Sequence, residues 1–139
     1  MCYALYLFTD EFIPEIQWKE ENPGMWVQAA SDGVDLDALK WPHNEKNVYY
    51  IGSYSRCGCG WSPVTKWDKA EDISWKQSGR RNLAEILHSL NDKNFWLAIS
   101  WEGDQGKPLL DETHLRIDDI LDNQFEFEEM RKYVIVSHL

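Results

Sequence analysis

Hydrophobic residues along the chain fall into short runs and alternating stretches that are typical of β-strands. Residues 3–9 form a nearly continuous apolar run, as expected of a strand covered on both faces. In residues 48–54 and 95–102, alternate positions share chemical character, which indicates strands with one face toward a core. Two more short strands are predicted, over residues 25–29 after an Asn-Pro-Gly turn and over residues 133–136.

One segment has the periodicity of an amphipathic helix. Leu83, Ile86, Leu87 and Leu90 recur at the spacing of a single apolar stripe, which predicts a helix over residues 80–90 that begins after a Ser-Gly pair. The shorter elements expected are a brief helix over residues 35–40, a strand over residues 115–117 and a brief helix that ends at residue 121. This order favours an α+β fold, a mostly antiparallel sheet of about five strands with one main helix packed on one face.

Length and composition predict one small domain. The 139 residues are 43% hydrophobic, enough to fill a single core, so we expect one domain over residues 1–139. The apolar runs are too short to cross a bilayer and the first residues lack the basic stretch of a signal peptide, so we expect a soluble cytoplasmic protein without a membrane partner. An odd number of cysteines, three, suits a reducing compartment, and no disulfide is expected.

Acidic residues are concentrated in one part of the chain. The formal net charge is -10, and residues 102–129 hold ten acidic residues against Lys107 and Arg116, a local net charge of -8. Nucleic-acid binding is not expected, because phosphate neutralisation needs clustered Lys and Arg. The acidic segment is interpreted either as a solvated face that serves solubility or as a docking surface for a basic protein.

Tryptophan is the other departure from ordinary composition, with eight residues in the chain. Trp61, Trp67 and Trp75 lie in segments rich in Pro, Gly, Lys or Asp, where loops are expected. Large aromatic residues anchor many binding surfaces, although each one could equally cover the core. The residues considered as a partner-binding set are therefore Trp61, Trp67, Trp75, Glu102, Asp104, Asp118, Asp119 and Asp122.

A Cys-Gly-Cys-Gly segment follows directly on the strand predicted at residues 48–54. Cys57 and Cys59 are candidate thiol or metal ligands, and the flanking glycines allow unusual backbone angles. A structural zinc site usually needs four ligands at wider spacing, and a reactive thiol needs a lowered pKa or a histidine partner such as His43 or His138. The simplest interpretation is a glycine-rich bend whose cysteines act as small buried hydrophobic residues. No cofactor is predicted.

The chain lacks the sequence motifs of common catalytic and nucleotide sites. There is no GxGxxG, P-loop, HExxH or GxSxG pattern. The turn at residues 103–106 lacks the later ligands of a calcium loop. We therefore expect a protein that is not an enzyme.

Four motifs together resemble a group of small bacterial proteins. They are Met1-Cys2, the run over residues 5–9, the Tyr-Ile-Gly-Ser run over residues 50–53 and the Cys-Gly-Cys-Gly run over residues 57–60, and they cover about a fifth of the chain. The resemblance implies no particular activity. In size, acidity and aromatic content the chain is also similar to immunity proteins of bacterial toxin systems, a likeness of type and not of motif.

Two functional hypotheses follow. The leading one is a non-catalytic protein-binding module, an immunity protein or inhibitor that neutralises a basic toxin domain, with acidic groups that steer association and tryptophans as anchors. The alternative is a thiol-dependent or metal-binding protein that uses Cys57 and Cys59.

Overall fold

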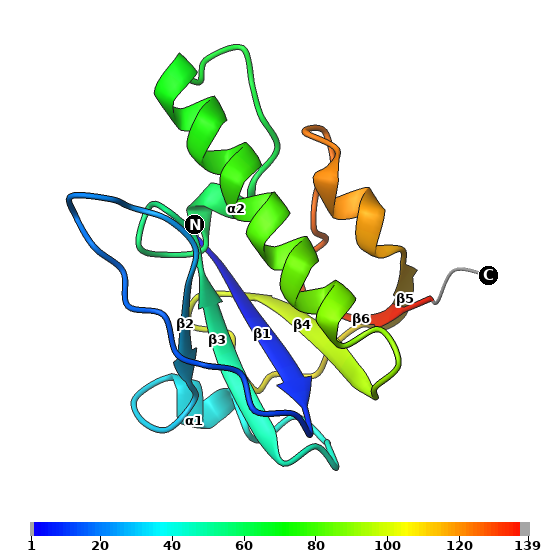
Figure 1. Ribbon diagram of the computed structural model, residues 1–139. Helices are drawn as coiled ribbons and strands as arrows, with labels where there is room; N and C mark the ends of the chain where they lie inside the picture. The colour runs from blue at the N-terminus through cyan, green and yellow to red at the C-terminus, as the bar shows by residue number, and fades with distance from the viewer. Residues whose placement is uncertain (1, 137–139) are drawn as a thin grey trace.

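The computed structural model describes residues 2–136, which form a six-stranded sheet with helices on it (Figure 1). The strands, in chain order, are β1 (Tyr3–Thr9), β2 (Trp26–Ala29), β3 (Asn47–Gly52), β4 (Phe95–Trp101), β5 (Asp111–Leu115) and β6 (Arg131–Ile135). Their spatial order is β2-β3-β1-β4-β6-β5, and every neighbouring pair is antiparallel except β5 and β6. The α+β fold predicted from the sequence is confirmed, with six strands in place of about five.

Strand β1 lies at the centre of the sheet and is buried along its whole length. Leu5 and Leu7 face the side covered by the long helix, whereas Tyr6 and Phe8 face a second core that contains Trp41. A strand with apolar neighbours on both faces reads as a continuous apolar run, which explains why this strand stands out in the sequence.

The long helix, α2 (Ala70–Ser89), crosses one face of the sheet (Figure 1). It begins ten residues before the helix predicted over residues 80–90. Its first half carries no apolar stripe, because a buried Lys76 takes a core-facing position and pairs with Asp68 at 2.8 Å. Gly79 lies inside the helix and not at its start, and it is buried beside the ring of Trp61. No helix within residues 2–136 is both long and apolar enough to span a membrane.

Three short helical elements complete the fold: α1 (Asp35–Ala38), η1 (Cys59–Trp61) and η2 (Ile117–Leu121). The helix expected over residues 35–40 is thus shorter. The strand expected over residues 115–117 lies earlier, as β5, because it pairs in register with β6 from Asp111 to Leu115.

One buried charge joins α2 to the surrounding loops. Arg80 is 1% exposed, and burial lowers its pKa because the charged form loses hydration. Its guanidinium nitrogens donate at 2.9 to 3.2 Å to the carbonyl oxygens of Trp61, Ser62, Ile120, Asp122 and Phe125. The side chain therefore holds the end of η1, the end of η2 and the segment after η2 against one helix.

Arg80→Met is expected to lower the free energy of unfolding by about 3 kcal/mol or more, because five carbonyl groups lose a charged donor. Urea denaturation measures this change. Arg81→Met is the matched control, since Arg81 is exposed on the same helix and should change stability by only about 0.5 kcal/mol. Equal stability of the two variants would contradict the role assigned to Arg80.

Candidate functional site

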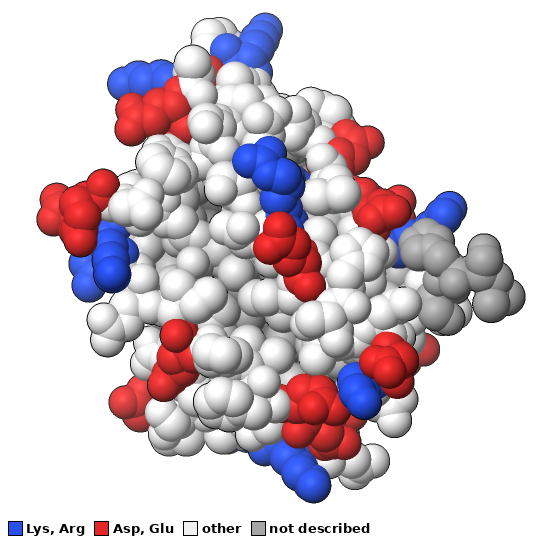
Figure 2. All heavy atoms as spheres, in the orientation of Figure 1, with Lys and Arg blue, Asp and Glu red and all other residues white. Residues whose placement is uncertain are grey.

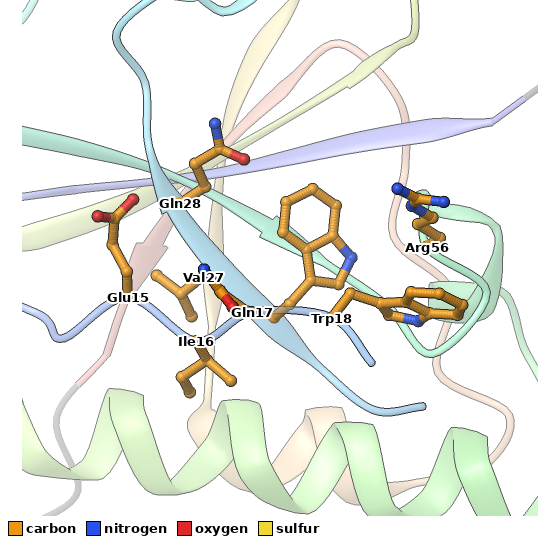
Figure 3. Close-up of a pocket in the computed structure, with 8 residues that line it drawn as sticks. Glu15, Ile16, Gln17, Trp18, Val27, Gln28 and Arg56 are labelled. Atoms are coloured by element: carbon orange, nitrogen blue, oxygen red, sulfur yellow. The ribbon is translucent and has the colours of Figure 1, made fainter. Parts of the chain in front are cut away.

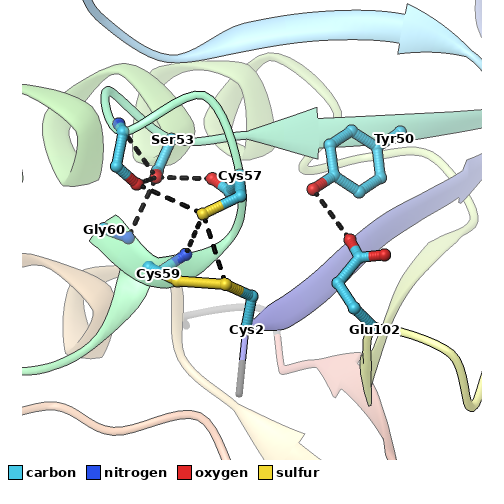
Figure 4. The surroundings of a disulfide bond; sticks show 8 residues. Cys2, Tyr50, Ser53, Cys57, Cys59, Gly60 and Glu102 are labelled. Carbon is cyan, nitrogen blue, oxygen red and sulfur yellow. Dashed lines mark hydrogen bonds between the residues drawn. A yellow bond between two sulfur atoms is a disulfide. The ribbon is translucent and has the colours of Figure 1, made fainter.

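Three cysteines from distant parts of the sequence meet at one point (Figure 4). Cys2 precedes β1, and Cys57 and Cys59 lie in the loop between β3 and the end of η1. Cys2 and Cys59 form a disulfide, whereas Cys57 is a free thiol whose Sγ lies 3.5 Å from that of Cys2. The three sulfur atoms are all within 4.8 Å of one another.

Two sequence expectations are corrected here. A disulfide is present where none was expected. The antiparallel pairing of β1 with β3 brings Cys2, at the start of β1, beside the residues that follow β3. The cysteines are also not buried hydrophobic residues, since none of the three is fully buried. A site of this exposure is open to small reductants, oxidants and ions.

Ser53, the residue after β3, organises the cysteine loop. Its hydroxyl donates to the carbonyl oxygen of Cys57 at 2.6 Å and accepts the backbone N–H of Gly60 at 2.9 Å. The backbone N–H of Ser53 also donates to the Cys57 carbonyl, at 2.8 Å. A 2% exposed serine with this many partners fixes both ends of the loop, a role that sequence analysis missed because Ser53 reads only as a strand residue.

The glycines of the loop are required by close packing. A Cβ on Gly58 would collide with the carbonyl of Tyr3, and a Cβ on Gly60 would collide with the side chain of Ser53. Arg56 adopts a positive φ of 74°, which turns the chain sharply before Cys57. The Cys-Gly-Cys-Gly pattern is thus the sequence that lets this loop lie directly against the start of β1.

A groove opens beside the cysteine loop (Figure 3). It has a volume of about 490 Å³, and Trp18, Trp26 and Arg56 are among its lining residues. The Arg56 guanidinium lies 5.2 Å from the ring centroid of Trp18, and the Trp18 indole N–H donates to the carbonyl oxygen of Tyr54 at 2.8 Å. The loop that holds Cys57 is therefore also supported from the segment between β1 and β2.

The tyrosines near the loop are hydrogen-bond donors that keep their protons. Tyr50 donates to a carboxylate oxygen of Glu102 at 3.2 Å, and burial followed by that carboxylate raises the pKa of Tyr50. Burial and a hydrogen bond to Asp72 raise the pKa of Tyr54 to about 12. Both phenols stay protonated at neutral pH.

Of the two histidines considered as thiol partners, the structure describes only His43, which does not join the cluster. The Nδ1–H of His43 donates to the carbonyl oxygen of Trp41 at 2.6 Å, and the imidazole ring packs against Phe8. His138 lies outside the described residues. In residues 2–136, no histidine or carboxylate joins the three sulfur atoms.

The three tryptophans of the predicted partner-binding set differ in exposure. Trp61 is 1% exposed, so it is no surface anchor, and its indole N–H donates to the carbonyl oxygen of Ile51 at 3.1 Å. Trp67 is 82% exposed and Trp75 is half-buried. The glycine-rich context of Trp61 had suggested a loop, whereas the residue closes the core beneath α2.

The acidic members of that set are spread over the surface, and several have structural partners. Glu102 binds Tyr50 and Gln105, and Asp104 pairs with Lys107 at 2.8 Å. Asp118 contacts His88 on α2, while Asp119 and Asp122 accept backbone N–H groups around η2. On the face seen in Figure 2, acidic and basic side chains lie side by side around the rim and do not gather in one negative patch.

Comparison with known proteins assigns neither a family nor a function. No family model matches the chain, and no curated protein or solved structure matches it either. The function must therefore be argued from the site itself.

Gly58→Ala is expected to push the cysteine loop away from Tyr3 and to lower the free energy of unfolding of the reduced protein by about 2 kcal/mol or more. It should also slow formation of the Cys2–Cys59 disulfide, measured by counting free thiols during oxidation. Gly24→Ala is the matched control, because a Cβ there meets nothing within 4 Å. Unchanged stability and unchanged disulfide formation in Gly58→Ala would contradict this packing.

Proposed function

We propose that this chain is a thiol-dependent redox protein whose reversible unit is the Cys2–Cys59 disulfide, with Cys57 as the adjacent thiol. The observation that carries the proposal is the position of the Cys57 sulfur, 3.5 Å from a sulfur of the disulfide in a site that is not fully buried. A purely structural disulfide has no need of a third thiol at this distance.

The chemistry is thiol–disulfide exchange. An external thiolate attacks one sulfur of the disulfide, the Cys2–Cys59 bond breaks, and its electron pair leaves with the other cysteine as a thiolate. A second external thiolate attacks the mixed disulfide and releases the first cysteine, so two electrons pass from two external thiols to the protein. The Cys57 thiolate can also attack Cys2, which forms a Cys2–Cys57 bond and frees Cys59 without net oxidation.

The fold couples this exchange to stability. The disulfide joins residues 57 positions apart, and closing a loop of that length stabilises a protein by about 4 kcal/mol in the chain-entropy treatment. In the reducing cytoplasm expected from the sequence, the ratio of the two forms would follow the local thiol potential. The first strand would then be covalently attached to the loop only under oxidising conditions.

Redox titration against defined glutathione ratios tests the proposal. We expect the purified protein to pass between one and three free thiols with a midpoint between about -300 and -180 mV, the range of reversible protein dithiols. Reduction should also lower the melting temperature, because the cross-link is lost. Mass spectrometry after alkylation identifies the paired cysteines.

Cys57→Ser and Cys59→Ser separate the roles of the two loop cysteines. Cys57→Ser should keep the Cys2–Cys59 disulfide and slow its exchange, whereas Cys59→Ser should remove that pairing. The proposal fails if all three thiols of the wild-type protein stay reduced in oxidised glutathione. It also fails if the reduction potential of the disulfide lies below about -300 mV, as that of a structural disulfide does.

We propose protein binding as a second candidate function, on the observation that Trp67 is 82% exposed in the segment before α2, which is bonded to the residues just after acidic η2. The Val64 N–H donates to the Asn123 carbonyl at 2.9 Å, and the Gln124 amide donates to Val64, so the segment before Trp67 lies against the residues next to Asp122. An exposed indole near acidic groups suits a basic protein, such as the cognate toxin of an immunity protein, as its partner.

Trp67→Ala is expected to abolish capture of a basic protein from a lysate of the source cells, and higher salt should weaken capture by the wild-type protein. Phe12→Ala is the matched control, because Phe12 is 79% exposed outside this surface. Recovery of no basic protein, or binding that neither Trp67→Ala nor salt reduces, would exclude this candidate.

A further inference from the structure

We infer that the reduced cysteine cluster is a metal site that binds one thiophilic ion, with Cu(I) preferred to Zn²⁺, through the sulfur atoms of Cys2, Cys57 and Cys59. The inference rests on the proposed function in one respect, since the Cys2–Cys59 disulfide must be reduced before all three sulfurs are free. It goes further because it gives Cys57 a role of its own and names a ligand.

The distances between the sulfur atoms suit a shared ion. All three lie within 4.8 Å of one another. Three sulfurs arranged around one ion at metal–sulfur bonds of about 2.3 Å are about 4 Å apart. Once the disulfide is open, the ion therefore needs only small movements of the cysteine side chains, and the backbone that carries them can stay in place.

That backbone is already fixed by contacts that do not involve sulfur. Ser53 holds the carbonyl of Cys57 and the N–H of Gly60, and Gly58 packs on the carbonyl of Tyr3. The backbone N–H of Cys59 donates to the sulfur of Cys57 at 3.3 Å. A hydrogen bond of this kind orients a ligand and stabilises negative charge on its sulfur.

The number and type of ligands favour Cu(I). Within residues 2–136, no histidine or carboxylate approaches the three sulfurs closely enough to supply a fourth ligand. Structural Zn²⁺ sites are almost always tetrahedral with four protein ligands, so zinc here would have to keep a water. Cu(I) is softer, prefers thiolates and is stable with three of them.

Metal binding and disulfide formation then exclude each other. Binding one Cu(I) to three cysteine thiols forms three metal–sulfur bonds and releases up to three protons, with no change of oxidation state. When the Cys2–Cys59 disulfide forms by exchange with an external disulfide, two electrons pass from two of the same sulfurs to that disulfide, which leaves as two thiols, and the ion is expelled. Oxidation would thus release the metal.

The test uses the full chain, reduced and kept free of oxygen. Cu(I) and Zn²⁺ are titrated separately against a chromophoric chelator, and X-ray absorption counts the sulfur neighbours of the bound ion. We expect one Cu(I) per chain with three sulfur neighbours, and no binding after oxidation to the disulfide. Cys57→Ser should retain two sulfur neighbours at most and weaken Cu(I) binding at least about tenfold.

Circular dichroism and formation of the Cys2–Cys59 disulfide are used to check that Cys57→Ser is folded, and Cys57→Ala provides a second variant without a hydroxyl. The inference is overturned if the wild-type protein binds Cu(I) through two sulfurs, if Cys57→Ser binds it equally well, or if Zn²⁺ alone binds. Metal binding through three sulfurs without a reversible disulfide would refute the redox proposal and leave the metal site standing. A reversible disulfide without metal binding would do the opposite.

Discussion

The arrangement of the loops depends on the hydrogen bonds from the guanidinium of Arg80 to backbone carbonyl oxygens. The guanidinium is buried, and its described hydrogen bonds all go to backbone carbonyl oxygens. Burying a cation costs hydration, and carbonyl dipoles at the end of η1, at the end of η2 and after η2 offset this cost. Helix α2 is thereby joined to the irregular parts of the chain as well as to the sheet.

This arrangement extends to the cysteine cluster. The carbonyls of Trp61 and Ser62, which Arg80 holds, directly follow the Cys-Gly-Cys-Gly loop, and the indole of Trp61 is bound to the end of β3. The loop is thus fixed at both ends by Ser53, and the residues directly after it are fixed by the helix. The chemistry proposed for the sulfurs would therefore take place on a backbone that these contacts hold in position, although the sulfurs themselves are accessible.

Secondary-structure elements that follow a local apolar pattern can be predicted from the sequence. An element that depends on one particular tertiary contact cannot. The apolar run of β1 and the alternation in β3 and β4 predict the centre of the sheet correctly. The first half of α2 is missed because the buried Lys76 occupies a position where a helix pattern requires an apolar residue. This charge is tolerated because Asp68 and the carbonyl oxygen of Pro63, in the segment before the helix, bind its ammonium group.

The same limit applies to the candidate site. The Cys-Gly-Cys-Gly loop is recognisable as unusual in the sequence. The third cysteine of the cluster, Cys2, is 57 positions from Cys59, and only the register between β1 and β3 places it beside the loop. Periodicity predicts that both strands exist but does not specify their register. The burial of Trp61 has a similar origin, because the residue packs beneath the part of α2 that the sequence pattern did not predict.

The position of Cys2 directly before the central strand has a practical consequence. Strand β1 pairs with β3 and β4, and the carbonyl of Cys2 accepts the N–H of Glu102, so the direction in which the chain enters the sheet is set. Any residues added ahead of Cys2 are therefore delivered next to the three sulfurs. An amino-terminal run of histidines would bring nitrogen ligands to them, so an affinity tag at this end would change the ligand set of the proposed metal site.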